Sequence, residues 1–241
     1  MVRIERLLVG TPCELVDGEK SAIWKETVSG PVNLGELGLD GDYHVYQTHG
    51  GADKALFHYA AEHYRMWADR FPSAREASGL ASLESDAATG GPVLPPRTLF
   101  GENIVTFGMT EEDVCLADRY RIGETVLVEV SQSRQPCWKL GFTSGAPEVP
   151  GLMQETASTG WYYRVIASGP IATHDPIVLE ARPLPGWSLA RIIRAFYGTP
   201  NDRDVMEELI GLPQLSTEFR AIVEKRLATG VVEEWNGRLY R

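Results

Sequence analysis

The chain has 241 residues and a formal net charge of −10 at pH 7, because 33 Asp and Glu residues outnumber 23 Lys and Arg residues. This acidic excess argues against a general nucleic-acid or membrane-surface binder, since both of those partners are polyanions. No run approaches the ~20 consecutive apolar residues of a membrane span, and the N-terminal stretch reads as a first strand and not as a signal peptide. Three widely spaced cysteines do not suggest a disulfide framework, so we expect a cytoplasmic protein.

Residues 1–185 are predicted to form mainly short β-strands separated by turns. Gly, Pro and Asp punctuate the segment and predict turns, for example at 16–21 and 29–33. Many short strands with irregular spacing favour a curled sheet or barrel. β-Branched and aromatic residues predict strands at 21–28, 55–59, 98–108, 125–132, 162–169 and 176–183.

Two helices and one long loop are predicted to interrupt these strands. Residues 61–71 place apolar side chains on one helical face, and residues 149–158 are a weaker helix candidate. Residues 73–97 are rich in Ser, Ala, Gly and Pro, so we expect a long flexible surface loop there.

After residue 185 the pattern becomes helical. Apolar residues recur at helical spacing over 188–198, 202–211 and 216–230, with Ser188 as the N-cap of the first segment. The sequence therefore predicts a mainly β fold with α-helices, divided into a β-barrel domain over 1–185 and a three-helix unit over 186–241.

The densest polar stretch is GLDGDYHVYQTHGGADKAL, residues 38–56. The pair Gly50 and Gly51 allows a ligand to approach the main chain closely. His49 can present an imidazole beside that pair, and Lys54 can present a mobile ammonium group. The alternative interpretation is a polar hairpin whose histidine is purely structural.

A second candidate stretch is FGENIVTFGM, residues 100–109. Glu102 and Asn103 lie between apolar residues that alternate as in a strand. They could supply a carboxylate and an amide at the rim of a cleft. The sequence alone favours the other interpretation, a turn that enters a strand with Glu102 in solvent.

The third candidate is Cys137 in SQSRQPCWKL, residues 131–140. Arg134 and Lys139 stand on either side of it, and cationic neighbours stabilise a thiolate. Pro136 suits the first turn of a helix, where free backbone N–H groups gather. Since a lone cysteine is often a small core residue, that alternative stays open. The histidines match no standard zinc-ligand spacing.

These segments together resemble the MOSC family, named for the C-terminal domain of molybdenum cofactor sulfurases, and most closely its YiiM-like subgroup. The resemblance covers nearly the whole chain. It rests on SAIWK, LGLDGDYHVYQTHGGADKAL, FGENI, GMTEEDVCLADRYRIG, VSQSRQPCWKL and the terminal helical unit. The chain departs from the family in the longer insertion at 73–97.

The resemblance implies a β-barrel core that binds molybdenum cofactor (molybdopterin), with the Cys137 sulfur as a ligand of the metal. It implies reduction of N-hydroxylated compounds, such as hydroxylaminopurines and amidoximes, with electrons from a separate flavin or iron–sulfur reductase. The chain itself has no ferredoxin-like cysteine cluster.

The residues suggest matching roles around such a cofactor. A soft thiolate is a reasonable ligand for molybdenum. N–O cleavage consumes protons, which Asp42, His49 and Glu102 could handle beside Cys137 as catalytic groups. The cofactor phosphate needs cations and polar donors, which we expect from Gly50, Gly51, Lys54, Asn103, Arg134 and Lys139.

Two other functions remain as alternatives. The protein could be a cofactor carrier or sulfur-transfer module in which Cys137 holds a persulfide and nothing is reduced. Three short helices could also form a DNA-binding motif. Residues 187–241 contain eight Lys and Arg and eight Asp and Glu residues, however, which is not the basic face that nucleic acid needs. We expect the helices to cover the barrel or to form part of a homodimer contact.

Overall fold

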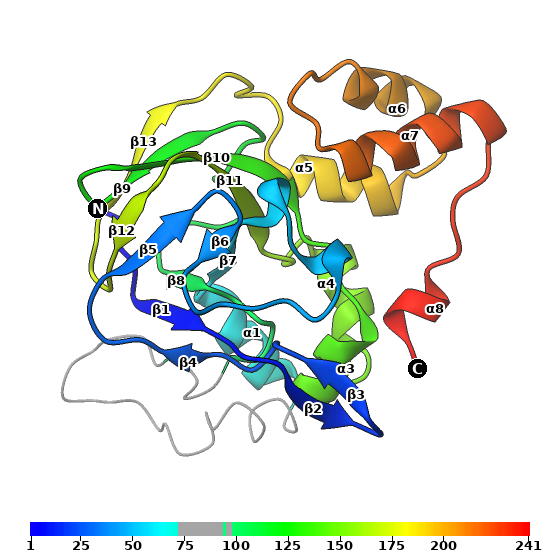
Figure 1. Ribbon diagram of the computed structural model, residues 1–241. Helices are drawn as coiled ribbons and strands as arrows, with labels where there is room; N and C mark the ends of the chain where they lie inside the picture. The colour runs from blue at the N-terminus through cyan, green and yellow to red at the C-terminus, as the bar shows by residue number, and fades with distance from the viewer. Residues whose placement is uncertain (72–93, 95–97) are drawn as a thin grey trace.

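The centre of this computed structural model is a curled, mixed β-sheet, which confirms the predicted mainly β fold (Figure 1). The structure describes residues 1–71, 94 and 98–241, so almost all of the predicted loop at 73–97 lies outside the described residues. Neighbouring strands run antiparallel except β7 and β8, which are parallel. In spatial order the strands are β13 (Ile177–Ala181), β9 (Arg119–Ile122), β10 (Val126–Ser133), β11 (Trp161–Ala167), β7 (Leu56–Ala60), β8 (Ile104–Thr106), β1 (Arg6–Val9) and β4 (Glu26–Thr27).

Two smaller sheets complete the β-structure of the described residues. One joins β12 (Gly169–Ile171), β5 (Val32–Gly35) and β6 (Gly38–Leu39), and the other is the hairpin of β2 (Cys13–Val16) and β3 (Glu19–Ser21). The hairpin turns at Asp17 and Gly18, both with positive φ, as a two-residue turn between twisted strands requires.

Helices surround the sheet. Along the chain, α1 (Glu62–Arg70) follows β7, α3 (Trp138–Ser144) follows β10, and α4 (Val149–Thr156) follows α3. The C-terminal helices are α5 (Leu189–Ile193), which continues as a π-helical turn over Arg194–Gly198, then α6 (Arg203–Ile210), α7 (Thr217–Thr229) and α8 (Asn236–Leu239). None of the helices in the described residues combines the length and apolarity needed to cross a lipid bilayer.

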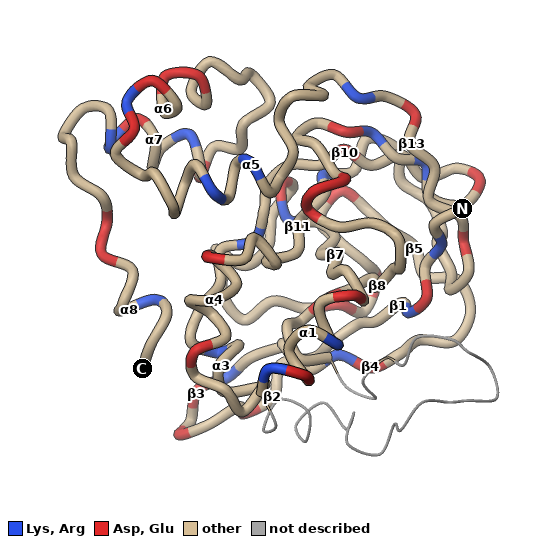
Figure 2. Tube along the Cα trace, turned by 180° about the vertical axis from the view of Figure 1, so that it is seen from behind, with Lys and Arg blue, Asp and Glu red and all other residues tan. Residues whose placement is uncertain are grey.

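The predicted N-cap at Ser188 is present, and α6 and α7 are capped in the same way. The side chains of Ser188, Asp202 and Ser216 accept hydrogen bonds from backbone N–H groups in the first turns of α5, α6 and α7. Such caps satisfy donors that a helix leaves free at its start. Along α6 and α7 acidic and basic residues are mixed (Figure 2).

One hydrophobic core joins the sheet to the C-terminal helices. Val126, Val128 and Val130 alternate along β10 and are fully buried, as are Phe196 and Val223 from the helices, in the same cluster of packed side chains. Burying side chains of this size stabilises a fold by roughly 1.5–3 kcal/mol each. The helical unit is therefore packed onto the sheet, while its division from the barrel at residue 185 stays a prediction.

Three sequence predictions about local structure were wrong. The stretches 21–28 and 98–108 are not continuous strands, since only β4 and β8 form within them. In the first stretch a side chain takes the place of a neighbouring strand. The Thr98 hydroxyl accepts a hydrogen bond from Lys25 N at 2.8 Å and donates one to Ile23 O at 2.9 Å. Glu102, for which the sequence favoured a position in solvent, is fully buried.

Candidate functional site

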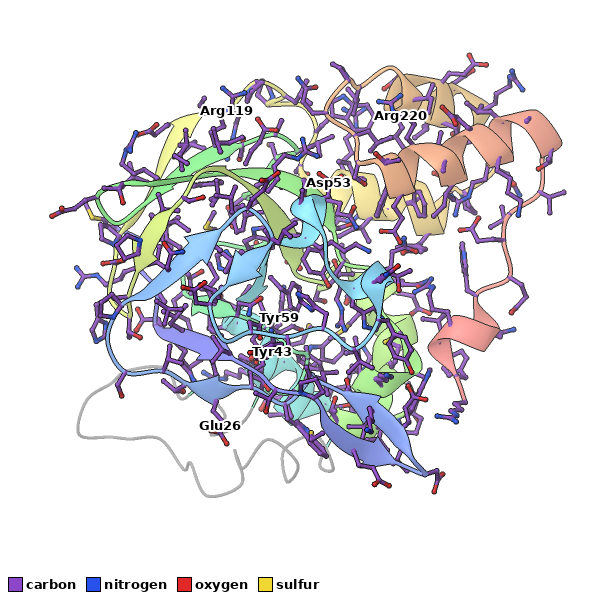
Figure 3. All side chains as sticks on the ribbon, in the orientation of Figure 1. Glu26, Tyr43, Asp53, Tyr59, Arg119 and Arg220 are labelled. Carbon is purple, nitrogen blue, oxygen red and sulfur yellow. The ribbon has the colours of Figure 1, made fainter. Side chains whose placement is uncertain are left out.

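A cavity of about 270 Å³ opens between the sheet, the segment before β7 and the C-terminal helices. Tyr43, an exposed residue of its lining, is labelled near the centre of the view in Figure 3. The cavity brings together most of the polar residues that the sequence singled out. The predicted site residues that line it are His49, Lys54, Asn103, Arg134, Cys137 and Lys139.

Cys137 lies between the end of β10 and the start of α3. Its backbone is extended and it forms the N-cap of α3. Cys137 forms no disulfide with the described residues, is only half-buried and is part of the cavity wall. This placement disfavours the alternative in which Cys137 is sealed among aliphatic core residues.

Arg134 supplies a buried positive charge with unused hydrogen-bonding capacity. The residue is 8% exposed, and its guanidinium lies 5.3 Å from the centre of the Phe57 ring. Its Nη1 atom is buried and has no hydrogen-bond partner among the described residues. A buried donor left without a partner costs free energy, so this atom is suited to an anionic or polar ligand in the cavity.

The two predicted lysines also face the cavity but are partly neutralised. Lys139 Nζ lies 2.8 Å from a Glu19 carboxylate oxygen and 4.8 Å from the centre of the Tyr46 ring. Lys54 Nζ lies 2.6 Å from a Glu218 carboxylate oxygen and donates to Thr48 O at 2.7 Å. Arg134 therefore differs from both lysines in having no carboxylate partner among the described residues.

His49 lies at the end of a short 3-10 helix, η1 (Gln47–His49). Loss of hydration and, to a smaller extent, the positive charges of Arg134, Lys139 and Lys54 together lower the pKa of His49 to about 4. The imidazole is therefore neutral near pH 7. A neutral ring offers one hydrogen-bond donor and one acceptor.

The glycine pair next to His49 does not line the cavity. A Cβ atom on Gly50 would lie 2.7 Å from Cδ2 of His44, a residue of the cavity wall. Gly50 thus allows the His44 ring to pack against the main chain. Gly51 has a φ of +102°, a torsion that other residues rarely adopt. Their predicted contacts with a cofactor stay predictions.

The two predicted carboxylates lie in the protein interior behind the cavity wall. Asp42 pairs with Lys25 at 2.5 Å and accepts from Gly10 N and Asn103 Nδ2, each at 2.8 Å. Glu102 is fully buried and accepts from Phe100 N at 3.0 Å and from the Tyr64 hydroxyl. Burial raises the pKa of Glu102. Both carboxylates have structural partners, and their predicted catalytic roles stay predictions.

Asn103 joins the cavity wall to this interior. Its Oδ1 accepts from Phe57 N at 3.0 Å, while its Nδ2 donates to Asp42 and to Leu8 O. The amide group therefore positions strand backbone and the Asp42 carboxylate.

Three charged residues of the cavity wall were missed by the sequence analysis. Lys25 lies in the stretch SAIWK, but no sequence pattern distinguished it as a site residue. Burial lowers the pKa of Lys25. Glu218 and Arg238 come from α7 and α8, far along the chain from Cys137. Only the packing of the helical unit onto the sheet brings them to the cavity.

Comparisons with known proteins agree with this architecture. Residues 45–178 match the MOSC domain, and residues 187–230 match the YiiM-like, 3-alpha helix domain. Protein YiiM of Escherichia coli (strain K12) is 36% identical over 225 residues, which cover 93% of this chain and 92% of that protein.

A protein named "Reductase" from Gibberella moniliformis is 33% identical over 207 residues, or 86% of this chain and 34% of that longer protein. The crystal structure of YiiM from Geobacillus stearothermophilus superposes with a TM-score of 0.72 at 32% identity, covering 94% of this chain and 100% of that one. The chain therefore belongs to the MOSC family, and its C-terminal helices place it in the YiiM-like branch.

Proposed function

We propose that the protein is a molybdenum-cofactor-dependent reductase of N-hydroxylated compounds, such as hydroxylaminopurines and amidoximes. The observation that carries this proposal is the meeting of the half-buried Cys137 with Arg134, Lys54 and Lys139 in one cavity. Membership of the MOSC family and a relative named as a reductase support a redox role.

The residues of the cavity fit the cofactor. A phosphate group accepts hydrogen bonds from guanidinium and ammonium groups, and the buried Arg134 Nη1 atom lacks such a partner among the described residues. The Cys137 thiol is a soft donor of the kind that suits a metal bound by sulfur. When bound, the cofactor would supply a redox-active molybdenum atom held by its dithiolene sulfurs.

The neighbouring residues would orient the substrate and manage its protons. Converting R–NHOH to R–NH₂ and water consumes two electrons and two protons. Neutral His49 can accept a hydrogen bond from the N–OH group and donate one from its other nitrogen. Lys25 connects the cavity to the buried Asp42, so Asp42 would act through Lys25 and not on the substrate directly.

Electrons would come from a separate flavin or iron–sulfur reductase. The three cysteines of this chain are fewer than the four that ordinarily hold an iron–sulfur cluster. We therefore infer a transient protein partner that delivers two electrons per turnover.

The test is expression in a host that makes the cofactor, followed by molybdenum analysis and a hydroxylaminopurine assay with a chemical reductant. We expect bound molybdenum and formation of the aminopurine. Cys137→Ser should lose activity, whereas Cys13→Ser, at an exposed cysteine outside the cavity wall, should retain it. A Cys137→Ser variant as active as the parent would refute the metal-ligand role. Bound molybdenum without any reduction would instead favour a cofactor carrier or sulfur-transfer module.

A further inference from the structure

The C-terminal helical unit contributes a carboxylate to a cavity that is otherwise lined by cations. Among the described residues of the wall, Glu218 on α7 is the only carboxylate. The cations of the same wall are Lys25, Lys54, Arg134, Lys139 and Arg238.

The surroundings of Glu218 resemble those of a bound anion. One carboxylate oxygen, Oε2, lies 2.6 Å from Lys54 Nζ and accepts from Gln132 Nε2 at 3.1 Å. The other, Oε1, accepts from Gln135 Nε2 at 3.1 Å. An ammonium group and two amide donors that converge on two oxygens would bind an external phosphate or carboxylate equally well.

Glu218 is also placed so that it can leave. Its side chain is 40% exposed, whereas that of Lys54 is only 15% exposed. Figure 3 shows Asp53, the neighbour of Lys54 on η2 (Ala52–Lys54), beside the start of α7. Since Glu218 lies in the first turn of the thirteen-residue α7, its charge would remain favourable there after release from Lys54.

We propose that Glu218 is a built-in anion that occupies Lys54 in the ligand-free protein and is displaced when an anionic ligand enters the cavity. Glu218 thereby sets the affinity of the cavity for anions. This inference rests on the proposed function, which identifies the kind of ligand as one with an anionic group held by Lys54 and Arg134. The helical unit thereby takes part in ligand binding, a role it would not have if the salt bridge only held helix and sheet together.

The test uses inorganic phosphate as the anion and protection of Cys137 from iodoacetamide as the readout. The protein is made in a host that cannot synthesise the cofactor, and ionic strength is held constant with sodium chloride. Peptide-resolved mass spectrometry separates alkylation of Cys137 from alkylation of the exposed Cys13. We expect phosphate to slow alkylation of Cys137 in the parent protein.

Glu218→Gln should lower the phosphate concentration for half-protection about fivefold, because a competing charge at 2.6 Å from Lys54 is removed. The matched control is Glu224→Gln, which removes the same charge from an exposed position on α7. It should leave the half-protection concentration unchanged. Lys54→Ala should raise that concentration and abolish the gain from Glu218→Gln in the double variant.

A merely structural salt bridge would give a different pattern. Glu218→Gln would then lower the melting temperature and leave phosphate protection unchanged or weaker, and that result overturns the proposal. Failure of phosphate to protect the parent protein overturns it as well. Both readouts are obtained without molybdenum, so they are independent of success or failure in the reductase assay.

Discussion

The two polar sides of the cavity wall differ in how fully their groups are paired. On one side, Lys25, Asp42 and Asn103 form a buried cluster in which the carboxylate accepts three donors. On the other side, Arg134 keeps a buried Nη1 atom without a partner among the described residues, and Cys137 is half-buried and outside any disulfide of these residues. Removing one partner from a paired buried charge is strongly destabilising, whereas an incompletely paired group is available to a ligand.

This difference separates the residues that stabilise the site from those that could bind in it. The paired cluster connects strand ends that are distant in sequence, because Asp42 accepts from Gly10 and from Asn103. We therefore expect changes there to reduce the free energy of unfolding. Changes on the open side should alter ligand retention and access with smaller effects on stability.

The largest effect is expected from Asp42→Ala. The change leaves Lys25 buried without its counter-charge and leaves Gly10 N and Asn103 Nδ2 without an acceptor. Breaking a buried ion pair on one side costs about 3 to 5 kcal/mol of stability. Urea denaturation monitored by tryptophan fluorescence measures this loss.

The matched control is Asp40→Ala, at an exposed residue two positions earlier. It should change the free energy of unfolding by less than about 0.5 kcal/mol. If the two variants were equally stable, Asp42 would not hold the wall, and the distinction between the two sides would fail.

A second large effect concerns pH and the buried His58. This ring is fully buried on β7, bonded to Tyr163 at 2.9 Å and Thr106 at 2.7 Å, and burial lowers its pKa to about 3 from 6.5. Between these values the unfolded chain binds a proton that the folded protein does not. Stability therefore rises with pH through this window, is fully present above 6.5 and is lost on acidification.

Acidification from pH 7 to pH 5 should cost the parent protein about 2 kcal/mol more than it costs a His58→Gln variant. The comparison between the two proteins cancels other titrating groups, such as Glu102, whose pKa burial moves the opposite way. The interval from pH 7 to pH 8 is an internal control, since the two proteins should change alike there. Equal losses at pH 5 would show that His58 accepts a proton without unfolding.

The fold was predictable wherever local pattern and tertiary packing agree. Val126, Val128 and Val130 alternate because one face of β10 is buried, and that alternation is visible in the sequence. Residues 21–28 look equally strand-like, but the hydroxyl of Thr98 occupies their backbone groups. No local pattern reveals a partner more than seventy residues away.

The site divides in the same way. Arg134, Cys137 and Lys139 were predictable because one short stretch carries all three to the cavity. Glu218 and Arg238 were missed because their approach depends on the packing of the helical unit onto the sheet. Asp42 was singled out as a catalytic group, a role that stays a prediction, and its buried partner Lys25 could not be inferred from spacing.

On the open side, Arg134→Ala should lower cofactor retention. Removing charge-assisted donors from a buried anion site costs enough to reduce bound molybdenum about tenfold after purification. Stability should fall less than in Asp42→Ala, because no carboxylate of the described residues loses a partner. Elemental analysis per mole of protein gives the measurement, and Arg65→Ala, at a side chain 90% exposed on α1, is the control. Unchanged molybdenum content in Arg134→Ala would count against the anion site.

The smallest effect is expected from Arg238→Ala on the C-terminal helix α8. The guanidinium donates to Pro136 O, next to Cys137, and to Gln154 Oε1 at 2.9 Å, so it ties the end of the chain to the segment that carries the thiol. Without these bonds the segment should open more often, and alkylation of Cys137 should be about threefold faster. Lys225→Ala, at an exposed position on α7, removes one positive charge as a control. If Cys137 were alkylated at the parent rate in both Arg238→Ala and Lys225→Ala, the cavity alone would determine the accessibility of this thiol. The helix α8 would then have no part in ordering the segment around Cys137.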